Sequence, residues 1–119
     1  MNELFERALA VAERAYAPYS GFKVGAAVRA RDGTIFEGVN VENAAYPLGV
    51  CAEKAALARA VTDGYGRGRL EELAVTASPC GGCRQWLVEL GLERIVYRNA
   101  AGELVSTTPA ELLPDTFEL

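Results

Sequence analysis

The sequence predicts an α/β fold in which helices cover both faces of a mixed five-stranded sheet. Apolar residues recur at helical spacing over 3–16, which is typical of a helix with one buried face. Short apolar runs, such as residues 95–97, alternate with helical segments in the order αββαβαββα. Because 119 residues support a single hydrophobic core, we expect residues 1–119 to form one domain.

The first half of the chain predicts a helix followed by a β-hairpin. After the helix over 3–16, apolar residues alternate with other residues over 24–30, which indicates a strand. Asp32-Gly33 is a common hairpin turn, and it predicts an antiparallel partner strand over 35–41.

The second half predicts alternating helices and strands, with helix boundaries marked by Pro and Gly. The expected elements are a helix over 51–63, a strand over 73–77, a helix over 79–91, strands over 95–97 and 104–105, and a last helix that follows Thr108-Pro109. The helix over 51–63 is rich in alanine, so we expect it to pack closely on the sheet.

Composition excludes several classes of chemistry and of partner. The chain has no histidine, which excludes Ser-His-Asp triads, Cys-His pairs and HExxH metalloprotease sites. Its net charge is −4, whereas nucleic-acid-binding proteins typically carry a cluster of basic residues. No window is long and apolar enough to span a bilayer, and the N-terminal residues do not resemble a signal peptide. We therefore expect a cytoplasmic protein with no nucleic-acid or membrane partner.

Three cysteines, each at the start of an expected helix, form the strongest candidate site. Cys80-Gly81-Gly82-Cys83 begins one helix and Cys51 begins another. Helix N-termini lower the pKa of thiols, and thiolates bind zinc at about 2.3 Å. Without histidine or a fourth cysteine, we expect three protein ligands and one open position, which is the pattern of catalytic rather than structural zinc.

Glu53 follows Cys51 by two residues, on the first turn of the same helix. From there its carboxylate is placed to take a proton from a water in the open position and to return it to the substrate. We expect Lys54 and Arg84 to offset the negative charge of the three thiolates. The Cys-Ala-Glu and Pro-Cys-x-x-Cys order matches the signature of zinc deaminases.

Six motifs carry a resemblance that runs nearly from end to end of the chain. They are Ala17-Pro18-Tyr19-Ser20, Phe22-Lys23-Val24-Gly25-Ala26-Ala27, Asn40-Val41-Glu42-Asn43-Ala44-Ala45-Tyr46, Cys51-Ala52-Glu53, Ser78-Pro79-Cys80-Gly81-Gly82-Cys83-Arg84-Gln85 and Glu111-Leu112-Leu113-Pro114. Together, and in this order along the chain, the six motifs are highly specific for one protein family. The chain resembles the cytidine deaminases of the small, homotetrameric, zinc-dependent type.

The resemblance implies a three-layer α/β/α cytidine-deaminase-like fold and one Zn²⁺ per chain. It implies that Cys51, Cys80 and Cys83 bind the zinc and that Glu53 is the catalytic proton shuttle. The implied reaction is hydrolytic deamination of cytidine and 2′-deoxycytidine to the uridines and ammonia, in pyrimidine salvage. The chain departs from the family at Lys54, where such enzymes often carry Arg, whose planar fork Lys does not reproduce.

The resemblance also implies a set of contacts with the substrate. Asn40 and Glu42 would bind ribose hydroxyls, and residues two apart on a strand project from the same face. The backbone N–H of Ala52 would bond the pyrimidine O2, and Phe22 would pack against the pyrimidine or sugar.

Further contacts would come from a homotetramer with shared active sites. The resemblance implies that Ala45 and Tyr46 reach the site of a neighbouring subunit. It also implies that Phe117, in the C-terminal tail, stacks near the base.

Three other functions remain open on the sequence. Deaminases of blasticidin-type aminoacylnucleosides share the motif, and parallel assays on both substrates separate the two. A polynucleotide cytosine deaminase is disfavoured by the net charge of −4. A non-enzymatic, zinc-stabilised interaction module predicts bound metal without release of ammonia.

Overall fold

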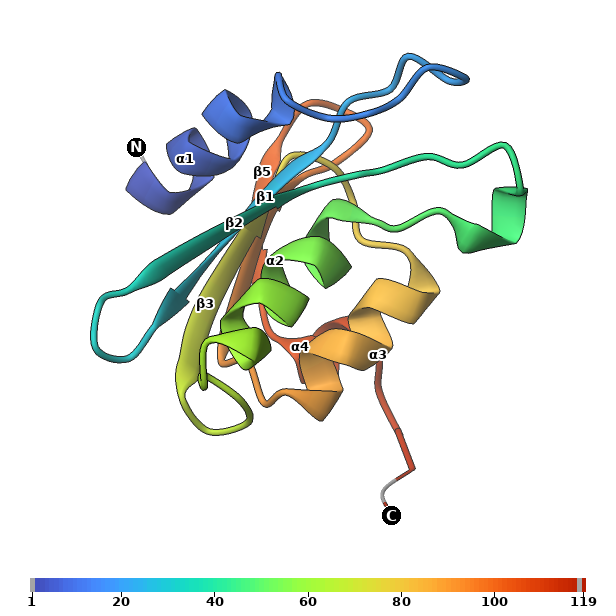
Figure 1. Cartoon of the computed structure of the whole chain (residues 1–119). Helices are drawn as coiled ribbons and strands as arrows, with labels where there is room; N and C mark the ends of the chain where they lie inside the picture. Colours follow the sequence, from blue (N-terminus) through green and yellow to red (C-terminus); the bar gives the residue numbers. More distant parts are fainter. Residues whose placement is uncertain (1, 118) are drawn as a thin grey trace.

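In the computed structural model, which describes residues 2–117 and 119, a five-stranded sheet packs between helices (Figure 1). The helices are α1 (Glu3–Ala12), α2 (Ala52–Thr62), α3 (Gly81–Glu89) and α4 (Pro109–Leu112), and a 3-10 helix spans Tyr46–Leu48. The strands are β1 (Gly25–Ala30), β2 (Ile35–Val39), β3 (Leu70–Val75), β4 (Arg94–Arg98) and β5 (Leu104–Thr107). No helix among the described residues has the length and hydropathy needed to cross a membrane.

The sheet is mixed and has the strand order β2-β1-β3-β4-β5. Strands β3 and β4 are parallel, with α3 as their crossover, and the other neighbours are antiparallel. As a result, the start of β1 lies between the ends of β2 and β3: Gly25 pairs with Val39, and Ala26 pairs with Val75. The segments that continue from these three strand ends therefore meet at one edge of the sheet.

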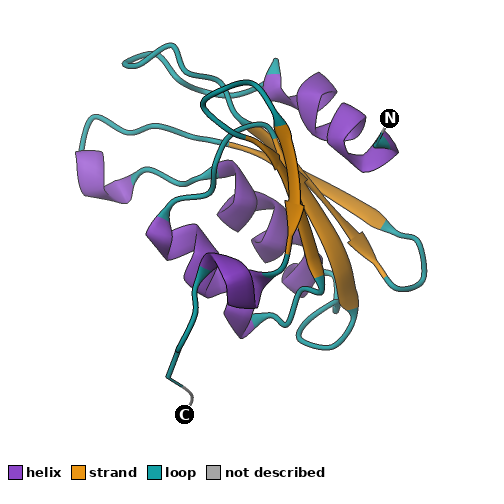
Figure 2. Cartoon of the chain, turned by 180° about the vertical axis from the view of Figure 1, so that it is seen from behind, coloured by secondary structure: helices purple, strands orange, loops and turns teal. Residues whose placement is uncertain are grey.

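Helices cover both faces of the sheet, and α1 lies on the face opposite the other three helices (Figure 2). The core under α1 contains Leu4, Phe5, Ala8, Ala27, Ala74 and Val96. The larger core on the other face contains Ala26, Val28, Ala30, Phe36, Ala52, Ala56, Leu57, Ala60, Leu70, Leu73, Val75, Leu87, Leu92 and Ile95. Because β1 and β3 contribute to both cores, their runs of small and apolar residues are buried on both sides.

Two glycines allow helices to approach the sheet more closely than any side chain permits. A β-carbon at Gly25 would lie 2.1 Å from the carbonyl oxygen of Ala8 in α1. A β-carbon at Gly38 would lie 2.3 Å from the backbone nitrogen of Ala56 in α2. The expectation that the alanine-rich helix packs closely on the sheet is therefore confirmed, and β2 supplies the matching glycine.

The expected α/β class and element order are confirmed, whereas several boundaries differ. The first helix ends at Ala12 rather than at Tyr16, because the Tyr16 backbone instead pairs with the chain beyond β2. Strand β2 ends at Val39, and Val41 forms isolated bridges with Tyr16 and Val50. Strand β3 begins at Leu70, which pairs with Ala30, and it ends at Val75.

Candidate metal centre and active site

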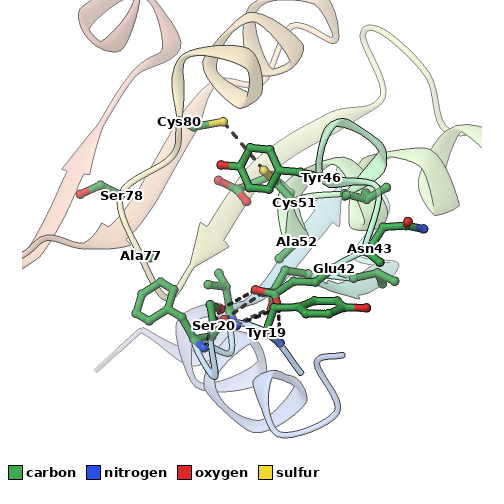
Figure 3. Close-up of a pocket in the computed structure, with 18 residues that line it drawn as sticks. Tyr19, Ser20, Glu42, Asn43, Tyr46, Cys51, Ala52, Ala77, Ser78 and Cys80 are labelled. Carbon is green, nitrogen blue, oxygen red and sulfur yellow. Dashed lines mark hydrogen bonds between the residues drawn. The ribbon is translucent and has the colours of Figure 1, made fainter. Parts of the chain in front are cut away.

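The three cysteines lie together at the N-termini of α2 and α3. Cys51 is the N-cap residue of α2, Cys80 is the N-cap residue of α3, and Cys83 lies on the first turn of α3. All three Sγ atoms are within 4.8 Å of one another, and those of Cys51 and Cys80 are 3.8 Å apart. Figure 3 shows these two thiols facing each other across the cavity edge.

The spacing of the sulfurs fits a tetrahedral zinc ion. Ligand bonds of about 2.3 Å at tetrahedral angles place two sulfurs about 3.8 Å apart, which is the separation of Cys51 and Cys80. Among the described residues, this trio is the one cluster of potential metal ligands, and it includes no fourth protein donor. The donor set therefore fits three-coordinate protein ligation with one position open.

Full ionisation of the three thiols depends on a bound cation. Burial raises the pKa of Cys83 well above that of a free thiol, and the charge of Glu53 raises it further. Burial likewise raises the pKa of Cys51. Burial also acts to raise the pKa of Cys80, but hydrogen bonds from the Cys83 backbone and the other thiols outweigh it, so this pKa is lowered. A metal ion supplies the positive charge that deprotonates all three.

Glu53 is a buried carboxyl group beside the cysteines. It lies on the first turn of α2, its exposed fraction is 4%, and it lines the cavity described below. Burial raises the pKa of Glu53, while hydrogen bonding from the Cys83 thiol and the charge of Lys54 partly offset this effect. A raised carboxyl pKa suits a group that must both accept and donate a proton.

The two basic residues next to the cysteines are placed differently. A β-carbon at Gly82 would lie 3.5 Å from Nζ of Lys54 and 4.0 Å from Sγ of Cys80, so the ammonium group is close to the thiols. Arg84 instead donates to the carbonyl oxygens of Pro79, at 2.9 Å, and of Leu112, at 3.1 Å. The Arg84 guanidinium thus ties the cysteine loop to the end of α4.

A cavity of about 820 Å³ opens beside Cys51, Cys80 and Glu53. It forms where the strand ends meet, and it is lined by the segments that follow β2 and β3 and precede β1. The lining includes five residues expected to contact the substrate: Phe22, Asn40, Glu42, Tyr46 and Ala52. Ala52 is the first residue of α2, so its N–H belongs to the free N-terminus of the helix.

Other expected residues lie outside this lining. Cys83 is fully buried and does not line the cavity. Ala45 precedes the 3-10 helix, and Phe117 lies in the tail after α4, which extends away from the body of the molecule (Figure 1). Tyr46 is 91% exposed and Phe117 is 72% exposed. Their expected contacts with a neighbouring subunit remain predictions.

Asn40 and Glu42 both hydrogen-bond to the loop that precedes β1. The Asn40 side chain accepts from the Val24 N–H at 2.8 Å and donates to the Phe22 carbonyl at 2.9 Å. Glu42 Oε1 accepts from the N–H groups of Tyr19, at 3.0 Å, and Ser20, at 3.1 Å. No motif or spacing in the sequence predicts these particular contacts.

Tyr19 and Ser20 also line the cavity, and neither was among the expected site residues. The turn signal Pro18-Tyr19-Ser20-Gly21 predicts a loop here but does not say what the loop contacts. Figure 3 shows both residues beside Glu42. Exposed N–H groups of a turn are common partners for a carboxylate. The turn motif is therefore the one sequence feature that indicates a carboxylate contact for this loop.

Comparisons with known proteins decide the family. A family model described as the cytidine and deoxycytidylate deaminase zinc-binding region matches residues 1–99. A cytidine deaminase of Sporosarcina psychrophila is 46% identical over 113 residues, covering 88% of this chain and 82% of the relative. The chain belongs to this zinc-binding deaminase family.

Solved structures of the family share the fold. The crystal structure of a cytidine deaminase from Burkholderia pseudomallei is 46% identical, has a TM-score of 0.90, and covers 98% of this chain and 100% of that one. The corresponding structure from Mycobacterium tuberculosis is 38% identical, has a TM-score of 0.83, and covers 98% and 95%. The three-layer, mixed five-stranded fold expected from the sequence is therefore confirmed.

Membership of the family also identifies the metal. The matched zinc-binding region includes Cys51, Cys80 and Cys83, whose sulfurs have the spacing of zinc ligands. Zinc is thus confirmed as the cofactor expected for this deaminase.

Proposed function

We propose that this chain catalyses the hydrolytic deamination of cytidine and 2′-deoxycytidine, giving uridine and 2′-deoxyuridine with release of ammonia in pyrimidine salvage. The observation that carries the proposal is a buried carboxyl group, Glu53, beside a three-thiol metal cluster at the edge of a large cavity. Family membership and the cytidine deaminases among its relatives support the same reaction.

Cys51, Cys80 and Cys83 would hold the zinc, which when bound acts as a Lewis acid that lowers the pKa of water. Glu53 would accept the proton that the attacking water loses and deliver it to N3 of the pyrimidine. Glu53 would then take the proton of the new hydroxyl group on C4 and pass it to the amino group, which leaves as ammonia as the C4 carbonyl forms, because an amine leaves poorly without a proton. One carboxyl group thus serves as base and then as acid.

The cavity lining supports an orientation for the nucleoside. The free N–H of Ala52 at the N-terminus of α2 would donate to the pyrimidine O2. Asn40 and Glu42 would bind sugar hydroxyls, and Phe22 would pack against the ring. This arrangement would direct C4 of the base toward the metal cluster and Glu53.

The charge of the cavity favours a nucleoside over a nucleotide or a polynucleotide. Among the described residues that line it, none carries a basic side chain, whereas Glu42 and Glu53 carry carboxylates. A phosphate group would find no partner there and would face two acidic side chains. The net charge of the whole chain, −4, also disfavours the binding of a polynucleotide.

We further infer one deaminase domain over residues 1–119 that works as a homotetramer with shared active sites. Tyr46 lies at the mouth of the cavity and is 91% exposed, which suits a residue that meets a neighbouring chain. Ala45 and Phe117 would contribute from adjacent subunits. A cytoplasmic location follows from the need to keep three metal-binding thiols reduced.

The decisive experiment follows loss of the cytidine absorbance band on addition of the zinc-loaded protein, with and without a chelator. The expected result is conversion to uridine with one ammonia per cytidine, abolished by the chelator. A parallel assay uses a blasticidin-type aminoacylnucleoside. Bound zinc without ammonia from either compound would establish the non-enzymatic alternative, and activity on the antibiotic alone would reassign the substrate.

A further inference from the structure

The loop over 17–22 lines the cavity but is held mainly by polar contacts rather than by a core. Tyr19 and Phe22 are 64% and 63% exposed. Gly21 adopts φ +71°, and its N–H donates to the Ala17 carbonyl at 2.9 Å, which closes the turn. The position of Phe22 therefore depends on hydrogen bonds made by its own backbone and by its neighbours.

Ser20 is the link between this loop and Glu42. Its hydroxyl donates to Glu42 Oε2, and its N–H donates to Oε1 at 3.1 Å. The same hydroxyl accepts from the Phe22 N–H at 3.0 Å. The Ser20 side chain thus joins the Glu42 carboxylate to the backbone of Phe22. Figure 3 shows Ser20 beside Glu42.

Glu42 is itself anchored to the body of the protein through backbone pairing. Its N–H donates to the Tyr16 carbonyl at 2.8 Å, and Val41 pairs with Val50 through two bonds of 2.9 Å. The backbone that carries Glu42 is therefore held by neighbouring segments, and Ser20 attaches the exposed loop to the Glu42 carboxylate.

We propose that Ser20 is a positioning residue for substrate binding: its hydroxyl orients the Glu42 carboxylate and holds Phe22 in place beside the sugar. This inference rests on the proposed function. A carboxylate accepts about four hydrogen bonds, and the loop occupies three of them, two on Oε1 and one on Oε2. Glu42 then retains capacity for one further donor, on Oε2, so it binds one sugar hydroxyl.

A single free acceptor determines how the sugar is recognised at Glu42. Both cytidine and 2′-deoxycytidine supply at least one secondary hydroxyl, so both satisfy it. Loss of the Ser20 hydroxyl leaves Oε2 of Glu42 without its partner in the loop, while Oε1 keeps its two N–H partners, and it removes the acceptor for the Phe22 N–H. Because neither change touches Glu53 or the thiols, the effect falls on binding rather than on the chemical step.

The test compares Ser20→Ala with Ser20→Thr, which keeps the hydroxyl, and with Ser106→Ala. Ser106 is a matched control because its hydroxyl accepts from Arg94 at 2.9 Å, outside the cavity. We expect Ser20→Ala to raise the KM for cytidine about tenfold, as for loss of a hydrogen bond to a charged group, with kcat changed less than about twofold. Ser20→Thr is expected to restore most of the affinity, and Ser106→Ala is expected to match wild type.

A double-mutant cycle with Glu42→Gln distinguishes positioning from general stabilisation. If Ser20 acts through Glu42, Ser20→Ala adds little to the KM of the Glu42→Gln protein. Fully additive effects on KM, or an unchanged KM in Ser20→Ala, would overturn the proposal.

Amide hydrogen exchange provides a readout that is independent of turnover. In Ser20→Ala, exchange at the Phe22 amide is expected to be about tenfold faster than in wild type, with the β-sheet amides unchanged. Absence of cytidine turnover by the wild-type protein would refute the proposed function. Equal Phe22 exchange in the two proteins would refute the role of Ser20.

Discussion

The β-carbon that Gly38 lacks would lie 2.3 Å from the backbone nitrogen of Ala56 and 2.7 Å from the carbonyl oxygen of Ala52. Both contacts are with backbone atoms of α2, which cannot move aside as the end of a flexible side chain can. The distance between β2 and α2 is therefore set by this glycine. Because Cys51, Ala52 and Glu53 lie at the start of α2, the same contact sets how deep the metal cluster lies.

Gly38→Ala is expected to destabilise the protein by at least about 1–3 kcal/mol, the usual cost of overpacking, and to lower zinc affinity because α2 must move away. Gly66→Ala is the matched control, since a β-carbon there meets nothing within 4 Å. Thermal unfolding of the two variants checks this. Equal melting temperatures would show that α2 and β2 adjust freely.

Removing a thiol and removing the Glu53 carboxyl group are expected to have separable effects. Cys80→Ala leaves two protein ligands and should lose most of the bound metal, as measured by atomic absorption. Glu53→Gln keeps all three thiols and should retain about one zinc per chain, while turnover falls by about 10²- to 10⁴-fold. Full activity in Glu53→Gln, or full zinc occupancy in Cys80→Ala, would contradict the assigned roles.

The ionisation of Glu42 is expected to depend on Ser20. The Ser20 hydroxyl and N–H, together with the Tyr19 N–H, hold the pKa of Glu42 below its ordinary value. A depressed pKa contributes stability that is present above the unfolded pKa and is lost as pH falls through the folded pKa. The loop contact should therefore persist through neutral and mildly acidic pH and disappear only below the ordinary range of glutamate.

Titration of the Glu42 carboxyl carbon by NMR measures this effect. In Ser20→Ala the pKa of Glu42 is expected to move up toward the ordinary glutamate value, because the hydroxyl contact, the largest of the pKa-lowering contacts, is lost while the N–H contacts of residues 19 and 20 remain. Ser106→Ala should leave the midpoint in place. The same midpoint in Ser20→Ala and wild type would show that the hydroxyl does not stabilise the ionised carboxylate.

The charge of the cavity predicts discrimination against phosphorylated substrates. With Glu42 and Glu53 in the lining and no basic side chain among its described residues, kcat/KM for the 5′-monophosphate of 2′-deoxycytidine should be at least about tenfold lower than for 2′-deoxycytidine. Competition between the two compounds at low and high salt checks this, since salt weakens the repulsion. Equal kcat/KM values would indicate a basic contribution from another subunit.

Mixing two inactive chains tests whether active sites are shared. A site that takes Glu53 from one subunit and Tyr46 from its neighbour is intact in about a quarter of positions when Glu53→Gln and Tyr46→Ala chains assemble at random. Co-expression should therefore yield activity well above that of either variant alone. Activity no higher than the parents would place Tyr46 in the site of its own chain.

Local spacing in the sequence was enough to predict which groups gather at each helix start, whereas only the fold brings Sγ of Cys51 to within 3.8 Å of Sγ of Cys80. Cys80 and Cys83 are three residues apart at a helix start, and such spacing puts both thiols near one N-terminus whatever the rest of the fold does. The same holds for Cys51 and Glu53 on α2. The order of elements was also predictable, because periodicity and turn residues are local properties.

The tertiary structure decided how the segments outside the helices meet. Asn40 and Glu42 were expected to face the sugar, yet the loop over 17–22 already occupies three of the about four acceptor positions of Glu42, and Asn40 bonds to the Phe22 carbonyl and the Val24 N–H. Nothing in the spacing of residues 20 and 42 indicates this contact. It arises because antiparallel pairing of β1 with β2 brings the start of one strand to the end of the other.

The amino-acid sequence alone thus determined which thiols and which carboxyl group stand at each helix start, and the order of helices and strands, since each depends on neighbours a few residues apart. Only the folded chain decided the burial of Glu53, the close approach at Gly38 and the link from Ser20 to Glu42. These depend on strand register and on helix-to-sheet distance, which are fixed when distant segments pack together.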